Sequence, residues 1–411
     1  MAIVEDVTDH DGRFDDGPDT KLDLLPTLRR LSKRLALPEN LLPSFMSEEK
    51  PHEALGVYRD HALSVLRQFL DKTRSSAWDQ LSICDHPDVI IDVFRLYGDD
   101  PWTSSAIRDI IDEIVVNLPA LTLAIHLLSQ PLRSLFSPTP HPMLNLMSAR
   151  ALSRPAGGVD AQSDFHDSTT QLYKSHPGWG CYNILSWCAS QLAPDELEKR
   201  IGVVLPPTLV MMDDWEPAWR GRGVRVLDGW MEKVSVETMR RMGMDKLLLD
   251  SLIHTLSLHA NPPLPHVLPV TLRLIERSTS GAERAERYAE IMDKAVIQGW
   301  TYAPQGKDGR PILINIAKEL EVLCSTLGIG ITRWLKAIIP NLLEPLHYPP
   351  SPVVLPHYIA NLSALLCITR LLSKTGRILR RRGQIIDVLA RLWLQIRERG
   401  DHIENRESES G

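Results

Sequence analysis

The sequence has little of what marks secreted, membrane-spanning or β-rich proteins. Its 411 residues include only five cysteines, an odd and scattered set that suits reduced thiols in the cytosol or nucleus. The N-terminal stretch MAIVEDVTDHDGRFDD holds no basic or apolar region, so we expect no secretory signal. No apolar run approaches the ~20 residues of a membrane span. Sustained alternation of apolar and polar residues is also absent, which argues against a β-sheet protein.

Positive charge is in short supply as well. The chain has 46 Lys and Arg against 52 Asp and Glu, a net charge of −6. Because nucleic-acid binding depends on clustered basic residues, we expect no nucleic acid as a partner. Hydrophobic residues make up 43% and charged residues 24%, which are ordinary globular values. The chain is too long for one compact core, so two lobes or one elongated stack of helices are expected.

Composition divides the chain into five parts. Residues 1–20 carry seven acidic side chains and one Arg, and we expect a disordered acidic tail there. An N-terminal helical lobe follows at 21–130, and an irregular linker rich in Pro, Ser, Gly and Asp at 131–178. Residues 179–398 are expected to form a C-terminal lobe, and 399–411 a disordered polar tail. The linker motifs Ser137-Pro138 and Thr139-Pro140 leave open either phosphorylation or an unmodified connector.

The spacing of apolar residues is helical between the two tails. Val224, Leu227, Met231 and Val234 step by three, four and three, which places them on one helix face. Many such segments joined by short, Pro-marked connections predict an all-α fold, an α-solenoid of HEAT- or armadillo-like repeats. Helices are predicted at 24–36, 52–72, 76–83, 87–97, 102–117, 119–130, 180–191, 194–203, 207–213, 217–231, 235–242, 244–259, 264–278, 281–297, 311–326, 329–339, 356–373 and 377–397.

The most informative segment is LPPTLVMMDDWEPAWRGRGVRVLDGW, which starts at Leu205. A helix carrying two prolines ends at Asp213 and Asp214, and a second, arginine-bearing helix begins after them. This is the layout of a HEAT unit: an aspartate at the turn can cap the second helix and complement its positive end. An arginine can then pair with the aspartate of its own or the next repeat.

Catalytic and metal-binding interpretations of the chain are weaker. Asp213-Asp214 superficially resembles the DDxxD magnesium motif of helical terpene synthases, but Pro217 replaces the last acid and no second metal motif follows. Cys181 and Cys188 are too far apart for a paired zinc motif and are expected as buried thiols. No phosphate loop, GxSxG or HExxH motif is complete. We therefore expect no enzyme, no metal, no cofactor and no small-molecule substrate.

The segment starting at Leu205 resembles the Tel-two-interacting protein two family, as do Lys174–Gly178, Ile184–Cys188 and Met242–Asp245. The resemblance covers residues 170–300. It implies a scaffold subunit of the Triple T co-chaperone complex. The expected direct partner is Tel-two-interacting protein one. Through the complex it would meet Tel-two, the heat-shock protein 90 machinery and phosphatidylinositol 3-kinase-related kinases of the mTOR, ATM, ATR and DNA-PK type, in cytoplasm and nucleus. Another HEAT or armadillo adaptor and an all-helical magnesium enzyme are the alternatives.

Nine residues are expected to maintain repeat geometry first and to contact a partner second. The tryptophans among them suit either a core between repeats or an interface. The nine residues are Trp187, Asp213, Asp214, Trp215, Trp219, Arg220, Arg222, Gly223 and Arg225.

The basic run Lys374, Arg377, Arg380, Arg381 and Arg382 could be a localisation signal, a patch for an acidic partner or a solvated helix face.

Overall fold

The computed structural model describes residues 21–42, 51–79, 81–156, 171–304 and 306–409. Over these residues the chain is all-helical, and its only β-type pairing is an isolated bridge between Leu144 and Ala151. The all-α prediction is confirmed. The acidic tail predicted at 1–20 lies outside the described residues. The chain divides into two compact units: unit 1 comprises 1–135 and 172–192, and unit 2 comprises 136–171 and 193–411.

The helices of unit 1 form two packed groups. α2 (Pro51–Thr73) lies against α1 (Lys21–Arg34) and α5 (Ser105–Val116). α9 (Cys181–Gln191) packs on α4 (Ile91–Arg95) and α6. α5 begins where Ser104 accepts a hydrogen bond from the Ile107 amide, a regular N-cap. The other α-helices of this part of the chain are α3 (Ser76–Asp79), α6 (Ala120–Leu127) and, at the boundary with unit 2, α7 (Arg133–Phe136).

α9 belongs to unit 1, whereas the sequence assigned it to the C-terminal lobe. Its Trp187 is 2% exposed and lies over Phe94 with ring centroids 3.9 Å apart. Its Asn183 donates to the Arg95 carbonyl at 2.8 Å and to the Asp100 carboxylate at 2.7 Å. These contacts join residues more than 80 positions apart, a distance over which composition carries no signal.

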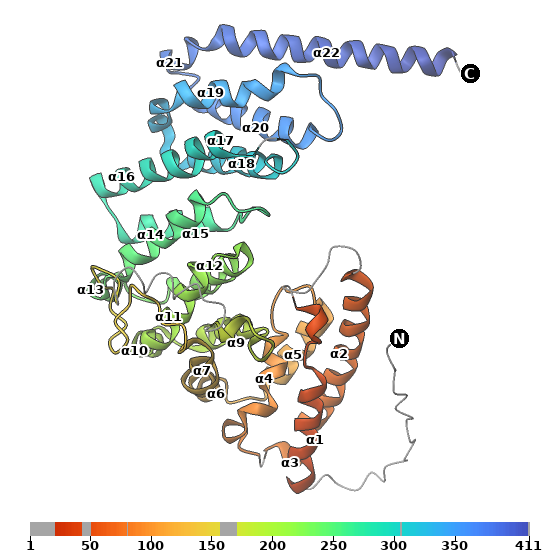
Figure 1. The fold of residues 1–411 in the computed structure, drawn as a ribbon, viewed down its shortest axis with the longest axis vertical. Coiled ribbons are helices and arrows are strands. Elements are labelled where there is room, and N and C mark those ends of the chain that lie inside the picture. Colours follow the sequence, from red (N-terminus) through yellow and green to blue (C-terminus); the bar gives the residue numbers. More distant parts are fainter. Residues whose placement is uncertain (1–20, 43–50, 80, 157–170, 305, 410–411) are drawn as a thin grey trace. The chain divides into compact units, whose positions relative to one another are not determined.

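Unit 2 contains the remaining helices, and most of them pack as antiparallel or neighbouring pairs. α11 packs on α12, α14 on α15 and α18 on α20, and neighbouring pairs meet through α11–α14 and α12–α15 (Figure 1). The bounds are α10 Pro194–Lys199, α11 Ile201–Met212, α12 Pro217–Met231, α13 Val236–Met242, α14 Met244–Ser257, α15 Val267–Ser278, α16 Gly281–Ile291, α17 Gln298–Tyr302, α18 Arg310–Leu327, α19 Leu335–Leu343, α20 Leu355–Leu371, α21 Gly376–Leu379 and α22 Arg382–Glu409.

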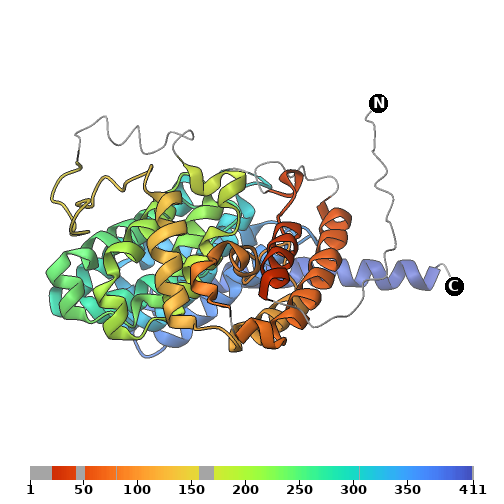
Figure 2. The ribbon, with the colours of Figure 1, turned by 90° about the horizontal axis from the view of Figure 1, so that it is seen from below.

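The structure departs from the predicted helices at several positions, and three differences in unit 2 are the largest. α11 begins at Ile201 and includes Pro206 and Pro207, whereas the predicted helices were 194–203 and 207–213. A π-helical segment at Met292–Ile297 links α16 to α17 in one run that extends past the predicted end at 297. α22 runs to Glu409, although a disordered tail was predicted from 399. The tail contains no proline and is rich in Glu and Arg, which are good helix formers. α22 extends past the other helices of its unit in both ribbon views (Figure 1, Figure 2).

Within the described residues no single helix combines the length and the apolar composition of a membrane span. Two helix pairs do so only when their members are counted together: 105–116 with 120–136, bent by 108°, and 310–333 with 335–347, bent by 115°.

Candidate interaction site at the turn between α11 and α12

The turn between α11 and α12 is ordered by Asp214. Pro217 is the first residue of α12, where a helix does not need its N–H. Asp214 is 1% exposed, and its Oδ1 accepts a hydrogen bond of 2.8 Å from the Glu216 amide. Glu216 is the N-cap residue of α12, so this bond reaches the residue just ahead of the helix, where the sequence predicted a cap on the first turn. Asp214 thus stabilises the approach to α12.

Arg220 reaches from the first turn of α12 back to the same loop. Its Nη1 donates to the carbonyl oxygens of Asp214, at 3.1 Å, and Trp215, at 3.0 Å. Burial lowers the pKa of Arg220, and the charges of Asp214 and Asp213 oppose that shift. Arg220 is thus linked to the aspartate turn through main-chain carbonyls, whereas the sequence led us to expect an arginine paired with an aspartate side chain.

Asp213 joins three segments that are distant in the sequence. Its Oδ2 lies 2.8 Å from Nε2 of His141, and its Oδ1 accepts a hydrogen bond from the Ser251 hydroxyl on α14. The other ring nitrogen of His141 accepts from the Met143 amide at 3.2 Å, so Nε2 carries the proton and donates to Asp213. His141 and Ser251 carried no sequence signal, since they lie 72 and 38 positions from Asp213.

The predicted residues on α12 serve the packing of the helix pair. Gly223 allows close approach, because a Cβ there would lie 2.6 Å from the Met212 amide nitrogen on α11. The Arg222 guanidinium stacks over the Trp219 ring at 4.6 Å, and Trp219 is 8% exposed. Arg225 is exposed. Trp187, by contrast, is in unit 1, so the structure groups only eight of the nine predicted residues around one helix pair.

The arginines that connect neighbouring helix pairs lie elsewhere. Arg273 on α15 binds Asp228 on α12, and Arg277 donates to the carbonyls of Met231 and Val234. Both side chains lie on one face of α15 because they are four residues apart. Sequence reasoning expected this role from Arg222 and Arg225 and missed Arg273 and Arg277, whose i,i+4 spacing was the available signal.

A cleft of about 520 Å³ opens beside the turn, and Trp215, 62% exposed, is among its lining residues. The aspartates in its wall already have partners: Asp213 and Asp214 as above, and Asp250 with Arg287 at 3.0 Å. Within the described residues no group of three or more His, Cys, Asp or Glu is placed to hold a metal ion. The cleft therefore offers an exposed aromatic ring beside occupied carboxylates, an arrangement suited to contact with another macromolecule. It is lined by His141, Pro142, Met143, Asp213, Asp214, Trp215, Arg220, Leu247, Asp250, Ser251, His254 and Leu258.

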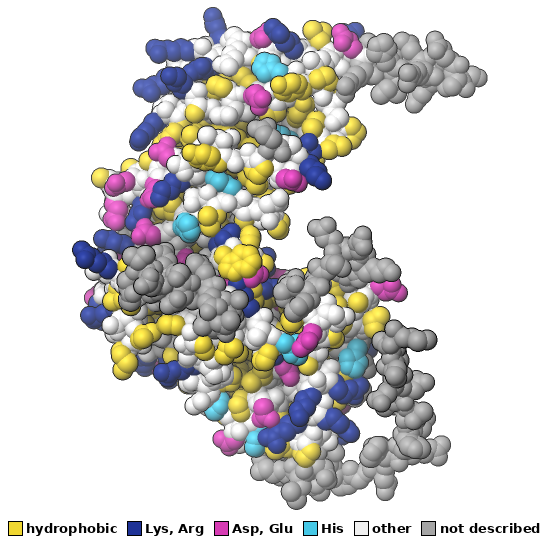
Figure 3. Space-filling model, viewed as in Figure 1, with side chains coloured by type: hydrophobic (Ala, Val, Ile, Leu, Met, Phe, Trp, Pro, Cys, Tyr) yellow, Lys and Arg dark blue, Asp and Glu magenta, His cyan; other side chains and the backbone are white. Residues whose placement is uncertain are grey.

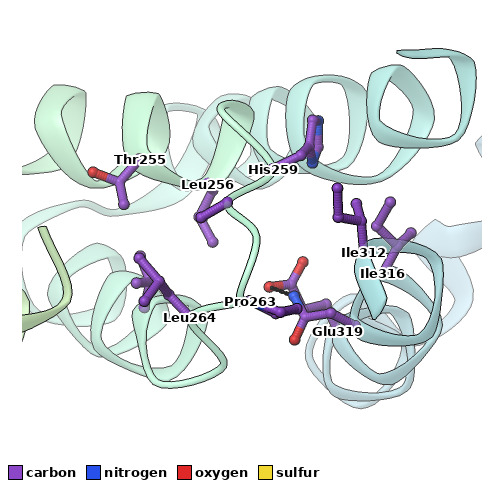
Figure 4. A pocket seen from close by; sticks show the side chains of 11 residues that line it. Thr255, Leu256, His259, Pro263, Leu264, Ile312, Ile316 and Glu319 are labelled. Atoms are coloured by element: carbon purple, nitrogen blue, oxygen red, sulfur yellow. Dashed lines mark hydrogen bonds between the residues drawn. The ribbon is translucent and has the colours of Figure 1, made fainter. Parts of the chain in front are cut away.

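A smaller cavity of about 20 Å³ lies between α18 and the end of α14 with the chain that follows it (Figure 4). Such a volume is enough for a water molecule and too small for a cofactor. Burial raises the pKa of Glu319 to about 7, and a hydrogen bond from Asn315 at 2.8 Å acts in the opposite direction. The Thr255 hydroxyl and His259 Nε2 are also buried at this cavity. The group therefore brings a buried carboxyl, a hydroxyl and an imidazole nitrogen to one small cavity.

The described part of the chain is an all-helical protein in which Asp213, Arg220 and Arg273 link helices and turns to one another. A family model described as Tti2 family matches residues 90–352, which includes helices of both units. The chain belongs to the Tti2 family, and the match extends on both sides of the 170–300 segment in which the sequence resemblance was found. A comparison with the curated proteins found no match.

Proposed function

We propose that this protein is a non-catalytic scaffold subunit of the Triple T co-chaperone complex. The observation that carries the proposal is the family match over residues 90–352. In this role the protein binds Tel-two-interacting protein one directly and meets Tel-two and the heat-shock protein 90 machinery through the complex. The complex supports the folding and assembly of phosphatidylinositol 3-kinase-related kinases of the mTOR, ATM, ATR and DNA-PK type. It works in the cytoplasm and the nucleus.

The proposed architecture is a HEAT-like α-solenoid in unit 2. Equivalent helices of the first two pairs, α11 and α14, begin at Ile201 and Met244, a spacing of 244 − 201 = 43 residues. HEAT and armadillo repeats have periods of about 40–47 residues. Stacking of α11 on α14 and of α12 on α15 supports this reading, because each pair buries on its neighbour the face that it cannot bury alone.

Co-expression with Tel-two-interacting protein one and Tel-two tests the proposal. We expect a complex that survives affinity purification and gel filtration in mild salt, with the three chains in fixed proportion. Cells depleted of this protein should contain less of the mature kinases at unchanged mRNA levels. If the purified chain captures neither partner, the assignment to this complex fails. Stable capture of a transport receptor in their place would favour the alternative of a trafficking adaptor.

A further inference from the structure

α22, the last helix of unit 2, carries two apolar faces. Ile385, Val388 and Leu392 are at most 7% exposed and bury one face, and the helix packs on the segment at 344–347. A second stripe is formed by Ile386, Leu389, Trp393 and Ile396, and we call it the α22 seam. Ile386 is 63%, Trp393 67% and Ile396 48% exposed, and Leu389 is half-buried. Large apolar side chains in such number on one helix face mark an interaction surface.

The spacing within the α22 seam matches a helical partner. Its members step by three, four and three residues, and Arg382 continues the stripe four residues earlier. This is the a/d spacing of a coiled coil, in which a narrow stripe receives the side chains of one facing helix. A membrane-bound helix presents a broader apolar face. Leu394, 55% exposed, lies outside the stripe.

The segment that leads into the N-terminal end of the seam is strongly positive. Residues 374–398 hold seven basic and two acidic side chains, a net charge of 7 − 2 = +5 in a chain whose total is −6. One of those acids, Asp387, forms an ion pair with Arg391, with its Oδ1 3.1 Å from Nε of the arginine. Lysine and arginine side chains gather at the α21 end of unit 2 in the space-filling view (Figure 3). The basic residues are Lys374, Arg377, Arg380, Arg381, Arg382, Arg391 and Arg397.

We infer that the α22 seam is a docking surface for an amphipathic helix of a partner protein whose apolar stripe is flanked by Asp and Glu. The basic run singled out in the sequence then acts as a charged patch at the N-terminal end of this interface, which steers an acidic helix and fixes its register. A second copy of this chain packed in parallel is a poor occupant, because the two basic ends would lie against each other. This inference rests on the proposed function, because it takes the occupant of the seam to be a helix of a protein that the scaffold binds.

A synthetic probe tests this with the full-length protein. It is a fluorescein-labelled three-heptad peptide with Leu at a and d and Glu at e and g, and a matched peptide carries Lys at e and g. We expect saturable binding of the Glu peptide by anisotropy and at least tenfold weaker binding of the Lys peptide. Ile386→Ser with Trp393→Ser should weaken the Glu peptide at least tenfold, and so should Arg380→Glu with Arg382→Glu. Tyr302→Ser, which removes a ring that is 76% exposed, is the control and should change nothing.

Four results would overturn the docking assignment. Equal binding of the two peptides would remove the charge argument, and unchanged binding by the double serine variant would remove the seam. Co-sedimentation with phosphatidylserine vesicles, lost in the same variant, would reassign the face to membranes. Capture of Tel-two-interacting protein one separates this inference from the proposed function. If the wild type captures it and the serine variant does so equally well, only the α22 seam is refuted; if the wild type does not, the proposed function fails whichever peptide binds.

Discussion

The Asp213 side chain is 26% exposed, yet each of its two oxygens engages a residue from another segment. Asp213→Ala removes both hydrogen bonds and leaves the buried His141 ring without its acceptor. We expect the free energy of unfolding to fall by roughly 2–4 kcal/mol, since hydrogen bonds to charged groups contribute about 1.5–3 kcal/mol each. Urea denaturation followed by circular dichroism measures the change. Asp228→Ala, which removes an exposed partner of Arg273, should cost no more than about 1 kcal/mol; an equal loss in the two variants would contradict the linking role of Asp213.

Glu319 makes stability depend on pH. Because burial raises its pKa in the folded state from 4.5 to about 7, the folded protein holds a proton that the unfolded chain releases in that window. The stabilisation is complete below pH 4.5 and is lost as the pH rises through 7, a change on the order of 3 kcal/mol. Glu319→Gln should remove this dependence. The difference in unfolding free energy between wild type and variant should be measured from pH 4 to pH 8, which spans both pKa values of Glu319; His259, whose pKa is lowered by burial, is present in both proteins and cancels in this difference. A difference that stays constant over that range would rule out this role.

At the level of elements, two glycines of α12 provide a matched pair. A Cβ at Gly223 would lie 2.6 Å from the Met212 nitrogen and 2.9 Å from the Met211 carbonyl carbon, so Gly223→Ala must push α11 and α12 apart. We expect the free energy of unfolding to fall by about 1–3 kcal/mol or more. Gly229 has no atom within 4 Å of its Cβ position, so Gly229→Ala should stabilise the helix by about 0.5–1 kcal/mol. Thermal unfolding of both variants gives the comparison. The two substitutions should shift the melting temperature in opposite directions. A Gly223→Ala protein as stable as wild type would disprove the close approach of α11 and α12.

Helices whose signals are local were predictable from the sequence. The helix predicted at 217–231 has those bounds, because Pro217 suits a first helical position and apolar spacing continues to Met231. The long-range parts were not predictable. The bonds from Asp213 to His141 and Ser251, and from Asn183 to Asp100, join residues whose distance in sequence hides their contact. α11 crosses Pro206 and Pro207 because it is buried almost throughout, and tertiary packing there overrides the local preference.

At the scale of the whole molecule, the chain passes between its two units at 135/136, 171/172 and 192/193. A fragment that ends at 178, the predicted lobe boundary, lacks α9 and exposes the apolar faces of α4 and α6 that pack on it. We expect fragment 1–178 to aggregate or to melt without cooperativity. Fragment 1–192 should remain monomeric by gel filtration and unfold in one transition. Equal behaviour of the two fragments would contradict the assignment of α9 to unit 1.

The same interleaving sets an order of events on the ribosome. Unit 1 lacks α9 until residue 192 has been made, 192 − 135 = 57 residues after its earlier part is complete. At about 5–20 residues per second, this delay is roughly 3–11 seconds. During that interval the nascent α4 and α6 present uncovered apolar surface, so the chain is most prone to aggregation before α9 has been made.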